Sequence, residues 1–242
     1  MDAGLGKSQF FKDLDDLRQQ LTEEGAMVQA RLEQAMRGLA GRDVDLLDDV
    51  AVSDGEINAR QMAIDDRAFK LLVLQQPVAS DLRVIVAAIK INSELERVGD
   101  LAVNLAESAR RYLSAAALPE QALLARMSDV AQAMFTEALS AFVSGNLGTA
   151  QAVLERDDAL DSLRAQTFRR LVEVMTQQPD RVPSALELML MARHLERIGD
   201  HATNIAEDVF FVVAGEDVRH HALGLPPAAA AGDERNGHGR EA

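Results

Sequence analysis

The sequence predicts an all-α protein built from two tandem, similar antiparallel three-helix bundles with six long helices. Three observations lead to this fold class. Leu, Ala, Met, Glu, Gln and Arg fill much of the 242 residues while aromatic residues make up only 4%, a composition that favours helices. No segment keeps up the apolar-polar alternation that is typical of a strand. The third observation is an internal repeat, which suggests two copies of one unit.

The repeat is clearest in two segments of thirteen residues. Residues 95–107 read LERVGDLAVNLAE and residues 195–207 read LERIGDHATNIAE, with nine identical positions. Upstream, both copies carry Gln-Gln-Pro, which ends at Pro77 in the first copy and at Pro179 in the second. Further upstream, each copy has a pair of acidic or amide residues four positions apart. Three landmarks in the same order indicate that two copies of one unit were joined.

Apolar periodicity and the positions of proline and glycine define the six helices. Proline is accepted in a first helical turn, so Pro77, Pro119 and Pro179 mark helix starts, while Gly41 and Gly145 mark helix ends. In chain order, the expected helices cover residues 8–39, 44–74, 77–113, 119–144, 149–176 and 179–215.

These helices group in threes, so we expect a first bundle in residues 1–115 and a second in residues 116–215. Residues 216–242 are rich in Ala, Pro and Gly and lack the apolar periodicity that a packed helix needs. We therefore expect this C-terminal segment to be disordered.

The charge balance excludes several classes of partner. The formal net charge is −14, whereas nucleic-acid binding and adhesion to anionic lipid both rely on Lys and Arg. We expect no nucleic-acid binding, and membrane association only through partner proteins. The chain has no cysteine, which excludes disulfides and thiolate metal sites. With no signal peptide and no apolar run of about 18 residues, we expect a soluble, cytoplasmic protein.

Paired carboxylates recur on the third and sixth expected helices. Glu96 and Asp100 are four residues apart, as are Glu196 and Asp200, so each pair shares one helix face. Like charges at this spacing cost a few tenths of a kcal/mol. A cation between the carboxylates would remove that cost, and hard cations prefer such oxygen ligands.

The preceding helices carry pairs with the same spacing: Asp54 with Asn58, and Asp157 with Asp161. If the helices lie side by side, four oxygen-bearing side chains meet in each half. A surface ion pair between Arg97 and the acidic residue three positions later, or a solvated polar face, explains these charges without a metal.

Glycine interrupts the acidic motif of both copies, at Gly99 and Gly199. A glycine inside a helix costs about 1 kcal/mol relative to alanine, so we expect close approach of another helix or a ligand at both positions.

The histidines are not repeated. His194 corresponds to Glu94 and His201 corresponds to Leu101. The repeat therefore does not support a histidine-containing transition-metal site, and a phosphate-accepting role for His194 is disfavoured for the same reason.

Both copies of the repeated segment resemble the paired signature of the PhoU family, as does the segment QPVASDLR at residues 76–83. The similarity spans residues 8–213. It implies two three-helix bundles and a cytoplasmic accessory role in phosphate homeostasis. In that role the protein contacts the ATPase subunit of a phosphate ABC transporter and a phosphate-responsive sensor histidine kinase. It restrains uptake and the starvation response when phosphate is plentiful, and the resemblance also implies a homodimer.

The resemblance further implies metal clusters at the acidic motifs. The candidate ligands are Asp54, Asn58, Glu96 and Asp100 in the first half, and Asp157, Asp161, Glu196 and Asp200 in the second. The Asn58 amide is a weaker ligand than a carboxylate, so the first site is expected to bind less tightly. Oxygen ligands alone suit Mg²⁺, Mn²⁺ or iron better than a typical Zn²⁺ site.

Two other functions are consistent with an acidic helical protein. A ferritin-like di-iron enzyme needs Glu-x-x-His pairs on two helices, and the sequence contains no such pair. A structural or adaptor protein unrelated to phosphate needs only the acidic faces. No nucleophile with a neighbouring base and no phosphate-binding glycine loop is present, so we expect no catalysis.

Overall fold

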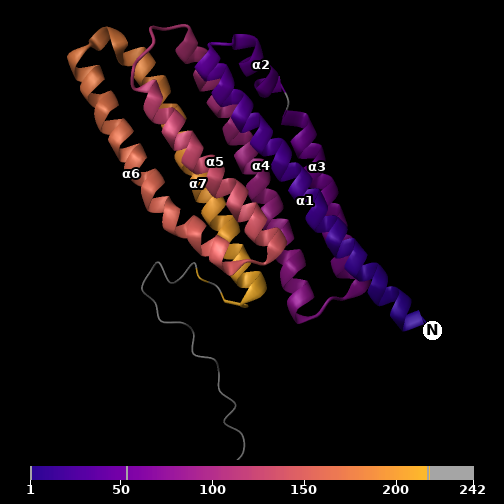
Figure 1. Ribbon diagram of the computed structural model, residues 1–242. Coiled ribbons are helices and arrows are strands. Elements are labelled where there is room, and N and C mark those ends of the chain that lie inside the picture. The colour runs from indigo at the N-terminus through magenta and orange to yellow at the C-terminus, as the bar shows by residue number, and fades with distance from the viewer. Residues whose placement is uncertain (1, 53, 217, 219–242) are drawn as a thin grey trace, which may run out of the picture.

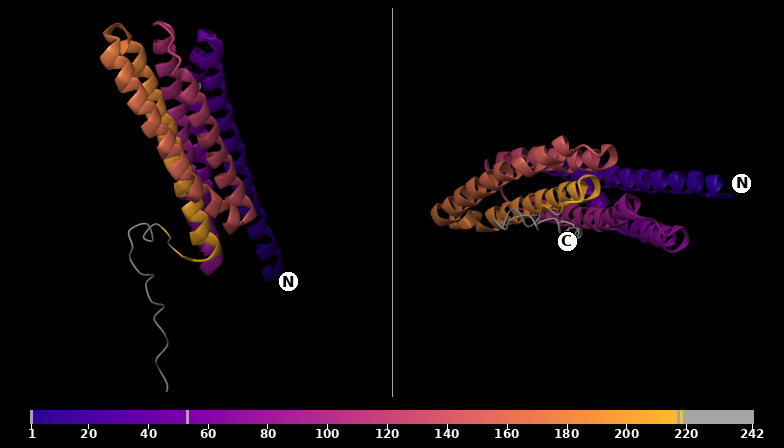
Figure 2. Two further views of the ribbon diagram at one scale, coloured as in Figure 1. Left: turned by 60° about the vertical axis from the view of Figure 1, so that its left-hand side comes forward. Right: turned by 90° about the horizontal axis from the view of Figure 1, so that it is seen from below.

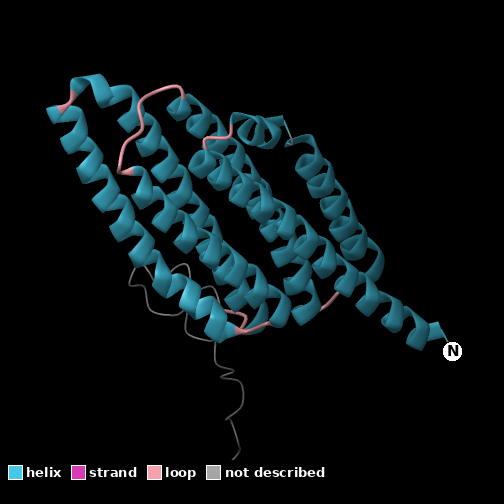
Figure 3. Cartoon of the chain, turned by 45° about the horizontal axis from the view of Figure 1, so that its top comes forward, coloured by secondary structure: helices cyan, strands magenta, loops and turns pink. Residues whose placement is uncertain are grey.

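The computed structural model describes residues 2–52, 54–216 and 218, and the side chains of residues 2–8, 54 and 56 also lie outside the description. This part of the chain is helical and contains no strand (Figure 3). The first half consists of α1 (Asp2–Gly41), α2 (Val44–Val52), α3 (Asp54–Gln75) and α4 (Ala79–Leu113). The second half consists of α5 (Gln121–Ser144), α6 (Leu147–Gln177), the 3₁₀ turn η1 (Pro179–Arg181) and α7 (Val182–Val213). The predicted all-α class with two similar three-helix units is confirmed.

One boundary differs from the sequence-based expectation. The helix expected over residues 44–74 corresponds to α2 and α3, and residue 53 between them lies outside the described residues. The third helix begins at Ala79 rather than at Pro77, because the connection after α3 is a tight turn in which Gln76 (φ 46°) and Ala79 (φ 42°) adopt the left-handed conformation. A residue that precedes proline is disfavoured in the helical region, which fits the end of α3 at Gln75. The expected disorder of residues 216–242 concerns a segment of which only 216 and 218 are described, so it stays a prediction.

The helices form an elongated, two-layered body in which α3 and α6 lie at opposite edges (Figures 1 and 2). The antiparallel pair α4 and α7 joins the two halves, and α1 contacts α5 in the other layer. One continuous cluster of buried apolar side chains runs through both halves. The halves therefore share a core, and the burial of that core is the main source of stability for such a fold.

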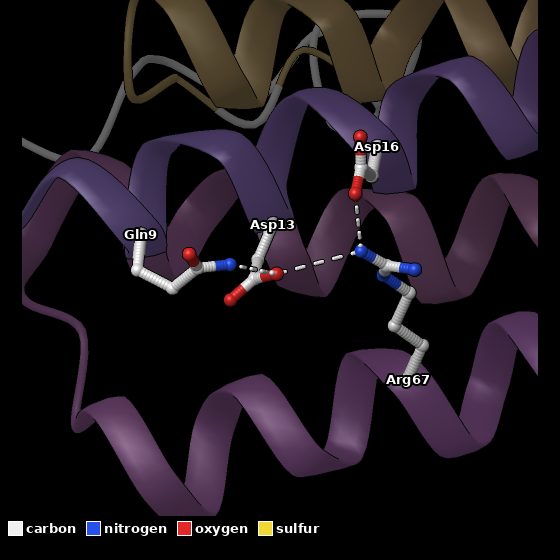
Figure 4. A network of polar contacts seen from close by, with 4 residues as sticks. All are labelled: Gln9, Asp13, Asp16 and Arg67. Carbon is white, nitrogen blue, oxygen red and sulfur yellow. Dashed lines mark hydrogen bonds and ion pairs between the residues drawn. The ribbon is translucent and has the colours of Figure 1, made fainter. Parts of the chain in front are cut away.

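Polar contacts hold the edge helix α3 against α1 (Figure 4). The Arg67 guanidinium of α3 donates to Asp16 at 2.8 Å and to Asp13 at 3.5 Å, both on α1. Gln9 donates to the same Asp13 carboxylate at 3.2 Å. Because these groups remain partly exposed to solvent, each ion pair contributes about 1 kcal/mol, and their main effect is to fix the register of the two helices.

The two repeated glycines lie where helices approach closely, as the sequence predicts. A Cβ at Gly99 would lie 2.9 Å from Ile57 Cδ1 of α3, and a Cβ at Gly199 would lie 2.3 Å from Leu160 Cδ2 of α6. Both distances are shorter than carbon-carbon contact. Close approach of a neighbouring helix, rather than of a ligand, therefore explains the glycine in each copy. No helix in the described residues combines the length and apolar character of a membrane span.

Candidate functional site

The four predicted ligands of the second half influence one another's charges. Asp157 and Asp161 lie on α6, and Glu196 and Asp200 lie on α7. Burial raises the pKa of Asp157, and the charges of Asp161, Asp158 and Glu196 raise it further. Burial and the Glu196 charge likewise raise the pKa of Asp200, with smaller contributions from Asp157 and Asp161. The packing of α6 against α7 thus gathers four mutually repelling carboxylates, as the repeat predicts.

An arginine that the sequence analysis did not single out stands between these carboxylates. The Nε atom of Arg164 lies 3.3 Å from Glu196 Oε1 and 3.6 Å from Asp161 Oδ1. Its guanidinium also lies over the Phe168 ring, 5.7 Å from the ring centroid, at a distance that allows cation-π attraction. In this structure Arg164 supplies part of the positive charge that the prediction assigned to a metal ion.

In the first half, α3 and α4 also lie side by side at the level of the motif, because Ile57 packs against Gly99. Glu96 and Asn58 are half-buried and Asp100 is exposed. The side chain of Asp54 lies outside the described residues, so its placement relative to the other three stays a prediction.

Among the residues whose side chains are described, no group of three or more His, Asp or Glu side chains is arranged to hold a metal ion. The donor set still fits a hard cation, because all eight predicted ligands are oxygen-bearing and the second-half carboxylates repel one another. Metal binding would require the second set to contract and Arg164 to turn away from Asp161 and Glu196. The metal role of the eight residues therefore stays a prediction.

One buried acidic residue was not among the predicted site residues. Glu24 of α1 is 0% exposed, and neither of its carboxylate oxygens has a hydrogen-bond partner among the described residues. Burial raises the pKa of Glu24 to about 7 although the Arg60 charge opposes this, and the charges of Asp65 and Glu96 raise it further. Glu24 thus points toward the α3–α4 side of the first bundle. In the sequence it follows the exposed Glu23, so nothing local distinguishes it from a solvated residue.

A second unpredicted contact joins the two halves. His201 of α7 is buried, and its Nδ1 atom lies 2.6 Å from Glu94 Oε2 of α4. Asn204 donates to the same oxygen at 3.2 Å. Burial raises the pKa of Glu94, but the hydrogen bonds with His201 and Asn204, together with the charges of His201 and Arg97, leave the pKa below its ordinary value.

The repeat does not duplicate this contact between α4 and α7. The corresponding positions of the repeat are occupied by His194 and Leu101, and burial together with the charge of Arg197 lowers the pKa of His194. The histidines therefore belong to the contact between α4 and α7, which joins the two bundles, rather than to a repeated metal site.

Comparison with known proteins follows the same division into two halves. The PhoU domain matches the chain twice, over residues 21–109 and 124–209. The phosphate-specific transport system accessory protein PhoU of Edwardsiella tarda is 34% identical over 212 residues, which cover 88% of this chain and 87% of that protein. The corresponding protein of Escherichia coli (strain K12) is 32% identical and covers 88% of each chain.

Solved structures show the same arrangement of helices. The crystal structure of PhoU from Pseudomonas aeruginosa has a TM-score of 0.82 and 33% identity, and the match covers 85% of this chain and 99% of that one. The phosphate transport system regulatory protein PhoU from Streptococcus pneumoniae has a TM-score of 0.80 and 26% identity, covering 86% and 99%. Since both copies of the domain are matched and the relatives align over most of their length, this chain belongs to the PhoU family.

Proposed function

We propose that this chain is a non-enzymatic regulator of phosphate uptake and of the phosphate-starvation response. The observation that carries the proposal is the double PhoU domain, together with relatives that are named accessory proteins of the phosphate-specific transport system. The proposed partners are the ATPase subunit of a phosphate ABC transporter and a phosphate-responsive sensor histidine kinase. We place the action in the cytoplasm, where both partners present their catalytic domains, and expect the protein to act as a homodimer.

The surface of the first bundle supports a role in protein-protein contact. Val73, Leu74 and Val78, around the α3–α4 turn, are 72%, 74% and 73% exposed. Contiguous exposed apolar side chains are typical of protein interaction sites. Through the shared Gln-Gln-Pro, Thr176 corresponds to Leu74 and Asp180 corresponds to Val78, so two of these three exposed apolar residues are replaced by polar ones in the second copy.

The paired carboxylates are proposed to hold hard cations such as Mg²⁺, Mn²⁺ or iron. Asp157, Asp161, Glu196 and Asp200 would bind the ion in the second half, with Arg164 displaced by it. The bound ion would supply the positive charge that relieves the mutual repulsion of the carboxylates. With a net charge of −14, so acidic a protein would meet free phosphate through such a cation or through a partner.

A phosphate-reporter assay tests the regulatory role. Cells that lack this gene should express phosphate-starvation genes constitutively in rich medium, and the wild-type chain should restore repression. Repression that stays normal in the deletion strain would refute the proposal. Pull-downs of the ATPase subunit and the kinase with the wild-type chain should succeed, and Leu74→Ser should weaken at least one of them. Thr176→Ser, at the matched position of the second half, serves as the control.

A further inference from the structure

Three helices contribute oxygen-bearing side chains to the inside of the first bundle. Gln20 and Glu24 lie one turn apart on α1, Asp65 lies on α3 and Asn92 lies on α4. Asn92 donates to Asp65 Oδ1 at 2.8 Å, and the charge of Asp65 acts on Glu24. We call these four residues the inner oxygen cluster. None of them belongs to the eight ligands predicted from the repeat.

Several oxygens of the inner oxygen cluster lack a donor among the described residues. Both Oε atoms of Glu24 are buried without a hydrogen-bond partner, and so are Gln20 Oε1 and Asn92 Oδ1. The amide of Asn92 is 0% exposed, and its Nδ2 donates to Asp65 and to the backbone oxygen of Gln61 at 2.9 Å. Both amide hydrogens are thus used, so turning the amide around would break two bonds and leave its oxygen no better placed.

Two arginines of α3 contact acids outside the inner oxygen cluster. Arg60 lies 3.6 Å from Glu23 on the outside of α1, and Arg67 lies 2.8 Å from Asp16. Asp65 forms no ion pair with any described residue. A buried carboxylate without a partner is costly, since its loss of hydration is not replaced. The cluster therefore presents negative charge and unmatched acceptors together.

The second half of the chain shows that the fold itself does not require these polar groups. Register between the halves follows from the side chains that face the two repeated glycines: Val28 in α1 corresponds to Met134 in α5, and Ile57 in α3 corresponds to Leu160 in α6. Apolar residues then replace three members of the inner oxygen cluster in the second bundle: Val130 for Glu24, Phe168 for Asp65 and Ala192 for Asn92.

We propose that the inner oxygen cluster binds one divalent cation of the Mg²⁺ or Mn²⁺ type. The carboxylates of Glu24 and Asp65 balance its two charges, and the amide oxygens of Asn92 and Gln20 complete a set of hard oxygen ligands. Only two of these four ligands are acidic, so the set is not one of the groups of three or more His, Asp or Glu side chains considered above. The cation ties α1, α3 and α4 together from the inside, and the second bundle, which is apolar at this level, has no such site.

Titration with Mn²⁺, followed by the electron paramagnetic resonance signal of the free ion, tests this proposal. The full chain is stripped with a chelator, in a background with Asp100→Asn and Asp200→Asn to weaken the outer carboxylates. We expect one bound Mn²⁺, displaced by Mg²⁺. Glu24→Gln should weaken binding by at least about tenfold, since loss of even a supporting residue costs a metal site 10–100-fold. Glu23→Gln, an equal change of charge on the outside of α1, should leave it unaltered.

Glutamine is nearly isosteric with glutamate, so Glu24→Gln is expected to keep the helical circular dichroism of the parent. Asp65→Asn provides a second test from another helix and should weaken binding in the same way. Absence of a bound Mn²⁺ in the background, or equal affinity in the parent and in Glu24→Gln, would overturn the proposal. The outcome does not depend on phosphate regulation, because the titration uses the purified chain and Mn²⁺ alone.

Discussion

Replacing Glu24 by glutamine should change how the stability of the protein depends on pH. The carboxyl group has an ordinary pKa of 4.5 in the unfolded chain and a pKa of about 7 in the folded protein, because burial disfavours its charged form. Between these two values the folded state binds the proton more tightly than the unfolded state. The stability that this group contributes is therefore fully present below pH 4.5 and is lost as the pH rises through 7.

The size of the effect follows from the difference between the two pKa values. At about 1.4 kcal/mol for each pKa unit, ionising Glu24 in the folded protein lowers the free energy of unfolding by up to about 3 kcal/mol. Glu24→Gln cannot ionise and escapes this loss. In the presence of a chelator, the difference in unfolding free energy between Glu24→Gln and the wild type should rise between pH 5 and pH 8, in favour of the variant.

Urea denaturation at half-unit pH intervals measures this difference directly. The exposed Glu23→Gln serves as the control, and its difference from the wild type should stay flat over the same range. A difference for Glu24→Gln that does not change between pH 5 and pH 8 would show that Glu24 titrates normally and that the burial argument is wrong. Adding Mn²⁺ to the wild type should remove much of the pH dependence if the inner oxygen cluster holds a cation, because the bound ion keeps Glu24 charged at little cost.

Three further changes test other parts of the structure. Gly199→Ala places a Cβ 2.3 Å from Leu160, so repacking should outweigh the helix-propensity gain and lower the unfolding free energy by about 1 kcal/mol in urea denaturation. Glu94→Gln removes the charged acceptor of His201 at the joint between the bundles and should cost about 1–3 kcal/mol by the same measurement. Arg164→Gln removes a cation that lies 3.3 Å from a predicted ligand. It should tighten Mn²⁺ binding by the second half about fivefold, a gain of about 1 kcal/mol, as measured by titration in the Glu24→Gln background.

Most of the fold could be predicted from the sequence, because each long helix carries its own apolar stripe and most of the connections contain a proline or glycine. The repeat added what periodicity cannot give, namely that the six helices form two similar sets. Gly99 and Gly199 lie at close helix contacts, as predicted, because a costly residue kept in both copies needs a steric reason. The left-handed turn after α3 was not predicted, because it depends on backbone geometry over a few residues.

The electrostatics of the site were harder to predict, because they depend on side chains from different helices. Glu24 is buried because α1 brings it to the level of Glu96, 72 positions later in the chain. Arg164 lies one turn beyond a predicted ligand, yet only the packing of α6 on α7 brings it within 3.3 Å of Glu196. Neither residue is repeated: the corresponding residues are Val130 for Glu24 and Gln61 for Arg164. A search for repeated features therefore passes over both.

The repeat provides an internal standard for deciding which features the fold requires. Paired carboxylates and interrupting glycines occur in both halves, so they belong to the common unit. The buried acid of the first half and the arginine of the second are found once each, and they have opposite effects on the neighbouring carboxylates. In the first half, Glu24 adds a negative charge near Glu96. In the second half, Arg164 neutralises part of the negative charge of the motif. A bound cation would therefore stabilise the two repeated motifs to different extents. The functional consequence that we expect is a difference in metal affinity between the halves.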